Sequence, residues 1–521
     1  MLVLERKWWT LAVVCAGIFM LLLDITIVNI ALPDLARDLD ASFSDLQWVI
    51  DAYALSLAAL LLIAGSLGDL AGARLIFLAG LVVFCVSSLL CGLAMDATLL
   101  IVFRAVQGVG GAAMFATSLA LLAHEFTGRA RGVALGAWGA TAGAAIAVGP
   151  LVGGALVSGA SWRWIFLINV PLGLACLAVG ITQVAETPRR SDVRPDWAGF
   201  ATLSLALVGI VYGLIRGNPD GWASPGVVAA FAVGAVLLIA FLVIEHRQRQ
   251  PMLDLGLFRN PALVGNSIGG FAIGASLFSM LLYITLYFQD ILGYSAFETG
   301  LRFLPISVLV LLVAPLSGRA SAHVPLRVLI GAGLALIAAG LALMTMVSPT
   351  SGWTALLAGM IVAGAGSGLT NPAAASAAVG TVRSDRPGVG SGIMNTFRQV
   401  GIAVGIAGLG AIFQNRVHGV FVEDLSESAP ALAARAERLA DQVTMGGPQA
   451  VEGTQDGPVA QAIQHALDAA FVSGFDRILW VAAIVAAVGA AFSAVLIQSR
   501  WIAEAPGASA EPTDAVGRRA A

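Results

Sequence analysis

Charged side chains are scarce in this sequence of 521 residues. Asp, Glu, Lys and Arg together make up 11% of it, whereas hydrophobic residues make up 58% and the mean hydropathy is +0.89. A soluble domain of average composition is about 25% charged, so this composition excludes a soluble globular protein. The formal net charge is −3, and no basic cluster predicts nucleic-acid binding. The composition instead indicates a polytopic membrane protein.

Cysteine and histidine are also rare, which limits the chemistry available to the chain. The four cysteines lie inside apolar runs without disulfide or metal spacing, so we interpret them as small packing residues. The five histidines show no metal-ligand or catalytic-triad spacing, and the sequence contains no ATP-binding motif. We therefore expect no enzyme activity, no metal, no cofactor and no ATP-driven pumping.

Apolar runs of helix length follow one another along the whole chain. About 20 apolar residues at 1.5 Å rise per residue cross roughly 30 Å of hydrocarbon. The sequence predicts fourteen such helices, at about residues 10–32, 46–67, 75–95, 99–122, 131–158, 165–185, 197–216, 225–244, 262–288, 300–318, 326–347, 353–379, 388–413 and 475–497. We therefore predict an all-α membrane protein whose even number of spans leaves both termini on one side.

Positive charge differs between the two sets of loops and predicts the orientation. The loops after even-numbered helices hold thirteen arginines: Arg74, Arg129, Arg131, Arg189, Arg190, Arg194, Arg247, Arg249, Arg259, Arg319, Arg327, Arg383 and Arg386. The short loops after odd-numbered helices hold four: Arg37, Arg163, Arg216 and Arg302. Because cytoplasmic loops are enriched in Lys and Arg, we expect both termini in the cytoplasm. The ratio of 27 Arg to 1 Lys indicates a high-GC bacterium, and therefore a bacterial cytoplasmic membrane.

The one long connection, residues 414–474, then faces outward. It contains an Ala-rich amphipathic stretch at about 429–443 and a break rich in Gly and Pro at about 446–458. We expect a solvated cap or a flexible hairpin there. The final residues, 501–521, have the composition of a disordered tail.

An internal repeat divides the chain. Residues 108–154 align without a gap on the stretch 256 positions later, with ten identities in 47 positions. At a nearby offset the first predicted helix aligns with the ninth, whereas the seventh and eighth have no counterpart. The sequence therefore predicts a six-helix bundle at 1–190, an inserted helix pair at 191–255 and a second six-helix bundle at 256–500.

The first predicted helix contains a carboxylate, Asp24. A charge near the middle of a membrane helix costs at least about 2.5 kcal/mol, so a retained one is a functional candidate. In the repeat its place is taken by Tyr283. Helix geometry places Asp24, Arg104 and Asp51 in the same part of one bundle, where we expect them to take part in proton coupling. The alternatives are a static Asp24–Arg104 ion pair and, for Asp51, an acid in contact with water.

Five segments carry a resemblance to a known family: Leu23–Pro33, Arg104–Gly111, Gly149–Gly154, Ser161–Pro171 and Asn395–Gln399. Together they resemble the fourteen-helix drug:proton antiporters of the major facilitator superfamily, the QacA/EmrB-like group. The resemblance implies the major facilitator fold with 14 transmembrane helices arranged as 6+2+6. It implies proton-driven efflux of amphipathic drugs or antibiotics by a monomer. The alternative is a proton-coupled importer or exporter of one small metabolite on the same fold.

Two motifs of the family depart from their usual form here. The motif between helices 2 and 3 has Leu70 and Ala73 at usual arginine positions, so its gating role would depend on Asp69 and Arg74. The helix 5 motif keeps Gly149, Pro150, Gly153 and Gly154, and Ala145 replaces its usual first glycine. We expect these small residues to let the two halves approach closely.

Several polar and aromatic residues could line an amphipathic substrate cavity: Asn29, Gln107, Trp138, Tyr283, Tyr287, Asn395, Phe397 and Arg398. For each aromatic residue, ordinary helix packing is an equal alternative. Arg398 would lie about 15 Å into its helix, near the midplane. It could pair with an acid across the cavity, bind an anionic group of the substrate, or cap a backbone carbonyl.

Overall fold

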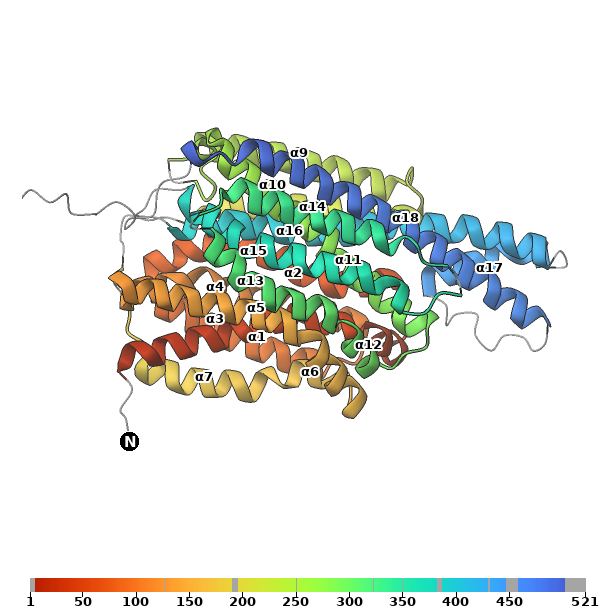
Figure 1. The fold of residues 1–521 in the computed structure, drawn as a ribbon, viewed down its shortest axis with the longest axis horizontal. Coiled ribbons are helices and arrows are strands. Elements are labelled where there is room, and N and C mark those ends of the chain that lie inside the picture. The colour runs from red at the N-terminus through yellow and green to blue at the C-terminus, as the bar shows by residue number, and fades with distance from the viewer. Residues whose placement is uncertain are drawn as a thin grey trace, which may run out of the picture.

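The protein is helical throughout the part of the chain that its computed structural model describes. That part comprises residues 5–126, 128–189, 195–249, 251–321, 323–348, 350–381, 387–429, 432–446 and 458–501, and it contains no β-strand. The helices run roughly parallel or antiparallel in one elongated bundle (Figure 1). This arrangement confirms the all-α prediction.

The first half contains seven α-helices that form six predicted spans: α1 (Arg6–Leu39), α2 (Phe43–Ala71), α3 (Ala73–Gly92), α4 (Ala97–Glu125), α5 (Gly128–Gly159), and the consecutive pair α6 (Trp164–Leu167) and α7 (Asn169–Gln183). The inserted pair is α8 (Trp197–Asp220) and α9 (Pro225–Arg247). Polar side chains in the short loops cap the N-termini of several of these helices. Ser42 and Asp45 form a capping box at the start of α2, and the Asp96 carboxylate accepts a hydrogen bond from the Leu99 N–H at the start of α4.

The second half begins with the short 3₁₀ helix η1 (Leu255–Arg259). It continues with α10 (Pro261–Ile273), η2 (Gly274–Phe278), α11 (Ser279–Leu286), η3 (Tyr287–Ile291), α12 (Ala296–Arg302), α13 (Leu304–Ala320), α14 (Leu326–Met344), α15 (Thr354–Gly380), α16 (Pro387–Ser428), α17 (Ala433–Gly446), α18 (Pro458–Leu496) and η6 (Ser499–Trp501). The segments η2 and η3 are π-helical turns within one span, and such turns are frequent at functional sites.

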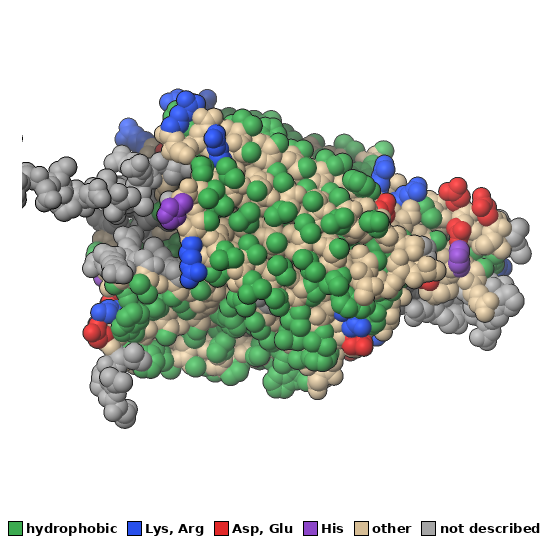
Figure 2. Space-filling view, viewed as in Figure 1, with side chains coloured by type: hydrophobic (Ala, Val, Ile, Leu, Met, Phe, Trp, Pro, Cys, Tyr) green, Lys and Arg blue, Asp and Glu red, His purple; other side chains and the backbone are tan. Residues whose placement is uncertain are grey.

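Each of the fourteen predicted spans overlaps a helix, but not every helix has the length and apolarity of a membrane span. Among the described residues twelve helices meet that test, and α5, which bends by 43° between Ala137–Ala145 and Val148–Gly159, gives a thirteenth. The helix α2 occupies the remaining predicted position. Hydrophobic side chains cover the flank of the bundle, and charged ones gather toward its two ends (Figure 2). The protein is therefore a multi-pass membrane protein, and fourteen crossings stay a prediction.

The long connection differs from the expected cap or flexible hairpin. Helix α16 continues to Ser428, α18 begins at Pro458, and α17 lies between them, so the described parts of 414–474 are largely helical. The two long helices pack on each other beyond the bundle, where the Arg416 Nε donates to the Ser473 hydroxyl at 2.9 Å. This antiparallel contact stabilises the two helices beyond the bundle, and a hydropathy pattern does not reveal such a contact. We call this end of the bundle the extension end (right in Figure 1).

The two halves pack against each other mainly through α2 and α5 of the first half and α12, α13 and α16 of the second. Helix α2 contacts α16, and α5 contacts α12 and α13. The inserted helix α8 contacts both α2 and α16, where the Asn218 amide donates to the Ala411 carbonyl at 2.5 Å. The helix pair α8–α9 therefore lies along one edge of the junction between the halves.

Candidate functional site

Asp24 and Arg104 form an ion pair inside the first half. The Arg104 Nη1 lies 2.5 Å from the Asp24 Oδ2, and each residue is only 1% exposed. Helix α1 carries Asp24, and α4 carries Arg104 opposite it. The pair brought together by the structure is therefore the one expected from the sequence.

A network of neutral polar groups completes this site. The Gln107 amide donates to the Asp24 Oδ1 at 3.0 Å, and its Oε1 accepts from Arg104 at 2.7 Å. The Asn169 amide lies 3.5 Å from the same Asp24 oxygen and donates to the Ser88 hydroxyl at 3.0 Å. Arg104 also donates to the Val49 carbonyl at 3.1 Å. We call Asp24, Ser88, Arg104, Gln107 and Asn169 the carboxylate cluster.

The carboxylate cluster holds its charges where water does not reach. An aromatic ring, that of Tyr53, lies 4.2 Å from the Arg104 guanidinium and stabilises the cation further. A buried ion pair is favourable only when hydrogen bonds satisfy its remaining donors and acceptors, and here both Asp24 oxygens accept. Adding a proton to Asp24 would remove one charge of the pair and weaken its bond to Arg104. The geometry therefore suits a site that responds to protonation.

Asp51 lies elsewhere, at the contact between the halves. It is 0% exposed, and neither carboxylate oxygen has a hydrogen-bond partner among the described residues. Near it, the Gln47 amide donates to the Ile406 carbonyl at 3.0 Å, and the Tyr283 hydroxyl donates to the same carbonyl at 2.8 Å. Asp51 is thus separate from the carboxylate cluster and is not the water-exposed acid of the alternative interpretation.

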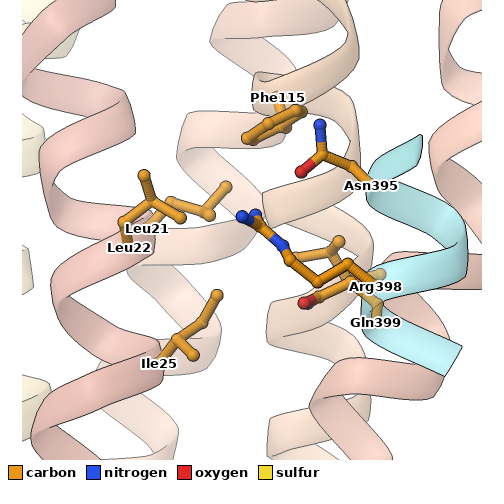
Figure 3. Close-up of a pocket in the computed structure, with 8 residues that line it drawn as sticks. Leu21, Leu22, Ile25, Phe115, Asn395, Arg398 and Gln399 are labelled. Carbon is orange, nitrogen blue, oxygen red and sulfur yellow. The ribbon is translucent and has the colours of Figure 1, made fainter. Parts of the chain in front are cut away.

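A small cavity remains between the halves near the middle of the bundle (Figure 3). Eight residues line it: Leu21, Leu22, Ile25, Leu57, Phe115, Asn395, Arg398 and Gln399. Its volume of about 10 Å³ is close to what one water molecule needs, so a drug-sized molecule does not fit without separation of the halves. Of the predicted cavity residues, Asn395 and Arg398 line this space.

The other predicted cavity residues lie outside this lining. Gln107 belongs to the carboxylate cluster. Asn29 donates to the Ile25 carbonyl on its own helix at 3.0 Å. Trp138 packs edge-on against Phe115, one layer behind the cavity, with 5.6 Å between ring centroids.

Three aromatic candidates pack within the second half or at its border. The Tyr287 ring stacks on Phe475 at 5.2 Å, and its hydroxyl donates to the Ser351 carbonyl. Phe397 packs on Phe258 of η1. Tyr283 lies at the junction of the halves near Asp51, as described above. For these aromatics the structure favours packing over cavity lining.

The helix 5 motif corrects one expectation. A Cβ added at Gly149 would collide with the Thr26 hydroxyl, and one added at Gly153 would lie 2.8 Å from Ile27 Cγ1, so both glycines face α1 of their own half. A Cβ added at Gly154 would lie 2.5 Å from the Ala296 carbonyl oxygen of α12, and the Pro150 carbonyl abuts Gly300. Residues four apart share a helix face, so 149 and 153 point one way and 150 and 154 another. Only the second pair meets the other half.

The motif between α2 and α3 is bound within the first half. The Arg74 guanidinium donates to the Ile181 carbonyl at 2.5 Å, and the Arg74 backbone N–H donates to the Glu186 carboxylate at 3.1 Å. The side chain of Asp69 lies outside the described residues. Gly72, with φ at 101°, makes the turn between the helices in a conformation that favours glycine.

A family model described as Major Facilitator Superfamily matches residues 14–406. The chain belongs to this superfamily. The Tetracenomycin C resistance and export protein of Streptomyces glaucescens is 32% identical over 521 residues, which cover 98% of this chain and 96% of that relative. The Puromycin resistance protein of Streptomyces alboniger is 36% identical over 414 residues, which cover 78% of this chain and 82% of that relative. These relatives confirm the resemblance to drug exporters of the superfamily.

A solved structure shares the major facilitator fold. It is that of a bacterial homologue of the human lysosomal transporter Spinster, in an inward-facing and unoccupied conformation. Its TM-score is 0.61 at 16% identity, and the match covers 94% of this chain and 97% of that one. This likeness confirms the fold.

In this major facilitator chain, the hydrogen bonds between the halves are not spread evenly. Toward the extension end, the Gln289 amide donates to the Ile30 carbonyl at 2.8 Å, and the Phe297 N–H donates to the Ser158 hydroxyl at 2.9 Å. The described residues near the start of α1 provide no such bond between the halves. The structure therefore holds the halves together most firmly at the extension end.

Ser88, Asn169 and Gln47 are site residues that sequence reasoning missed. Asn169 lies within one of the family-like segments, Ser161–Pro171, which was a usable signal. Ser88 and Gln47 have no sequence signal of their own. Ser88 reaches Gln107 because α3 packs on α4, and Gln47 reaches the Ile406 carbonyl because α2 packs on α16.

Proposed function

We propose that this protein exports amphipathic drugs or antibiotics across a bacterial cytoplasmic membrane in exchange for protons. The observation that carries the proposal is the carboxylate cluster, in which a titratable acid and a cation are paired out of contact with water. The names of the relatives, which refer to resistance and export, support efflux as the direction. Both termini would lie in the cytoplasm, and the monomer would be the working unit.

Protonation of Asp24 would be coupled to the substrate through helix α1. The cavity-lining residues Leu21, Leu22 and Ile25 lie on a face of α1 about 100° around the helix from Asp24. Proton and substrate would therefore bind to different groups and would not compete directly. Instead, loosening the Asp24–Arg104 pair would let α1 shift, and α1 contacts both α5 of its own half and α11 of the other.

Residues 1–190 and 256–500 would be the two moving halves, with 191–255 as an accessory pair. In transporters built from such repeats, alternating access is rocking of one half against the other around a central site. The energy supply is adequate for one proton per substrate. One charge crossing 100 mV releases about 2.3 kcal/mol, which sustains roughly a 40-fold gradient of a neutral solute.

A susceptibility panel in a host without its own drug pumps tests this proposal. Cells that make the wild-type protein should tolerate higher concentrations of polycyclic antibiotics than cells that make Asp24→Asn. An uncoupler should raise the accumulated drug in wild-type cells to the level of the variant. The surface variant Asp220→Asn, which loses only the bond to Arg216, is the matched control. Uncoupler-sensitive uptake instead of efflux would overturn the proposal and favour an importer.

A further inference from the structure

The guanidinium of Arg398 is a cation without a counter-ion near the middle of the bundle. Helix α16 carries it into the cavity, where it points toward Leu21 and Leu22 of α1 (Figure 3). Between described residues, the Arg398 guanidinium forms no ion pair and donates no hydrogen bond, and it contacts an aromatic ring. The ring centroid of Phe278 lies 5.8 Å from the guanidinium carbon. This arrangement removes two of the three roles that the sequence left open, an acid partner and a capped carbonyl.

Neither Asp24 nor Asp51, the two buried acids described in the spans of the first half, pairs with Arg398. Asp24 is bound by Arg104 and Gln107 on another face of α1. Asp51 is fully enclosed, and neither of its carboxylate oxygens has a partner among the described residues. No acid is among the residues that line the cavity. The positive charge of Arg398 therefore remains available to whatever enters the space between the halves.

The surroundings of Arg398 define the chemistry of a matching ligand. Leu21, Leu22, Ile25, Leu57 and Phe115 form an apolar wall on the side of the first half. On the side of the second half, the buried Gln399 Oε1 has no hydrogen-bond partner among the described residues, so it can accept from a donor on a ligand. A guanidinium fits planar anionic oxygens with two parallel hydrogen bonds.

We propose that Arg398 binds the anionic group of an apolar, ring-containing substrate, such as a carboxylate, a phenolate or an enolate. The assignment depends on the proposed export function and specifies its substrate class. A cationic substrate is disfavoured because it would meet an unpaired positive charge and no lining acid. The inside-negative potential would also help to expel an anion.

Equilibrium binding to the full-length protein in nanodiscs tests this proposal with three matched fluorescent probes. The probes are anthracene-9-carboxylate, its neutral methyl ester and the cationic 9-(aminomethyl)anthracene. Wild-type protein should bind the carboxylate about tenfold more tightly than the ester, which is the effect of a charge-assisted hydrogen bond. Arg398→Gln should lose this preference and keep its affinity for the ester, and Arg398→Lys should keep part of the preference.

Arg416→Gln is the matched control, because it removes an exposed arginine further along the same helix. It should bind all three probes as the wild type does. Size-exclusion profiles show whether each variant is folded. If Arg398→Gln is not folded, the reduced preference of Arg398→Lys for the carboxylate replaces it as the test. Equal binding of carboxylate and ester by wild type, or an unchanged preference in folded Arg398 variants, would overturn the assignment.

The binding assay needs no proton gradient, so its failure differs from failure of the export function. If the preference is absent while Asp24-dependent efflux persists, the anion assignment alone is wrong. If the carboxylate preference depends on Arg398 while no compound is exported, the assignment of the binding group stands and the export function is wrong.

Discussion

The Asp24 carboxylate accepts hydrogen bonds from three side chains, two on α4 and one at the start of α7. Arg104, Gln107 and Asn169 enclose it, and none of them lines the central cavity. The proposed proton-binding group is therefore separated from the cavity where substrate would enter. Arg398, which is partly buried, lines the cavity itself. The groups proposed to bind the proton and the substrate are thus two separate residues, Asp24 and Arg398.

Asp24→Asn should fold and lose uphill transport. The asparagine oxygen can still accept from Arg104, which also keeps its bonds to Val49 and Gln107. Purified Asp24→Asn in liposomes should not accumulate substrate from an imposed pH gradient, although slow downhill exchange should remain. Arg104→Gln should be worse folded, because it leaves a buried carboxylate unpaired at a cost of about 3–5 kcal/mol. Gradient-driven accumulation by Asp24→Asn would contradict the coupling role of Asp24.

At the scale of single helices, α5 shows how a one-residue shift changes the partner. Gly149 and Gly153 pack on α1, whereas Pro150 and Gly154 pack on α12 of the other half. The first contact is permanent, because both helices belong to one bundle. The second must break each time the halves separate at the extension end. The same motif therefore contains a contact within one half and a contact between the two halves.

Gly154→Val should abolish efflux without unfolding the protein, since its side chain would collide with the Ala296 carbonyl and prevent closure at the extension end. Gly153→Val should instead lower the melting temperature, because Ile27 of the same half occupies the space that the new side chain needs. Thermal unfolding and efflux measured on both variants distinguish the two effects. Normal efflux by Gly154→Val would mean that this contact does not have to form during transport.

For the whole molecule, the distribution of arginines among the loops predicts the orientation in the membrane. The contacts between helices do not predict it. The extension of α16, α17 and α18 projects from the end opposite to the start of α1 (Figure 1). If the arginine-rich loops are cytoplasmic, this extension lies outside the cell. The end at which the halves are bonded most firmly is then the outer one.

Cysteines placed at two serines test this orientation. In intact cells, a cysteine at Ser191, between the first half and the inserted pair, should be protected from an impermeant thiol reagent. A cysteine at Ser428, which is exposed at the end of α16, should react readily. Cys15 is only partly buried, so a Cys15→Ser background serves as the control. The reverse pattern of labelling would place the extension in the cytoplasm.

The sequence by itself determined where the helices lie, that they cross a membrane, and that Asp24 and Arg104 belong together. Hydropathy is a local property, and the cost of an unpaired charge in a membrane favours a pair between an acid and a cation at similar depth in one bundle. Tertiary structure decided which helix face each residue uses. Each residue turns a helix by about 100°, so packing alone separates Gly153 from Gly154, encloses Asp24 and leaves Arg398 in the cavity. It also decided that α16 and α18 continue beyond the bundle, because their mutual contact joins residues far apart in the chain.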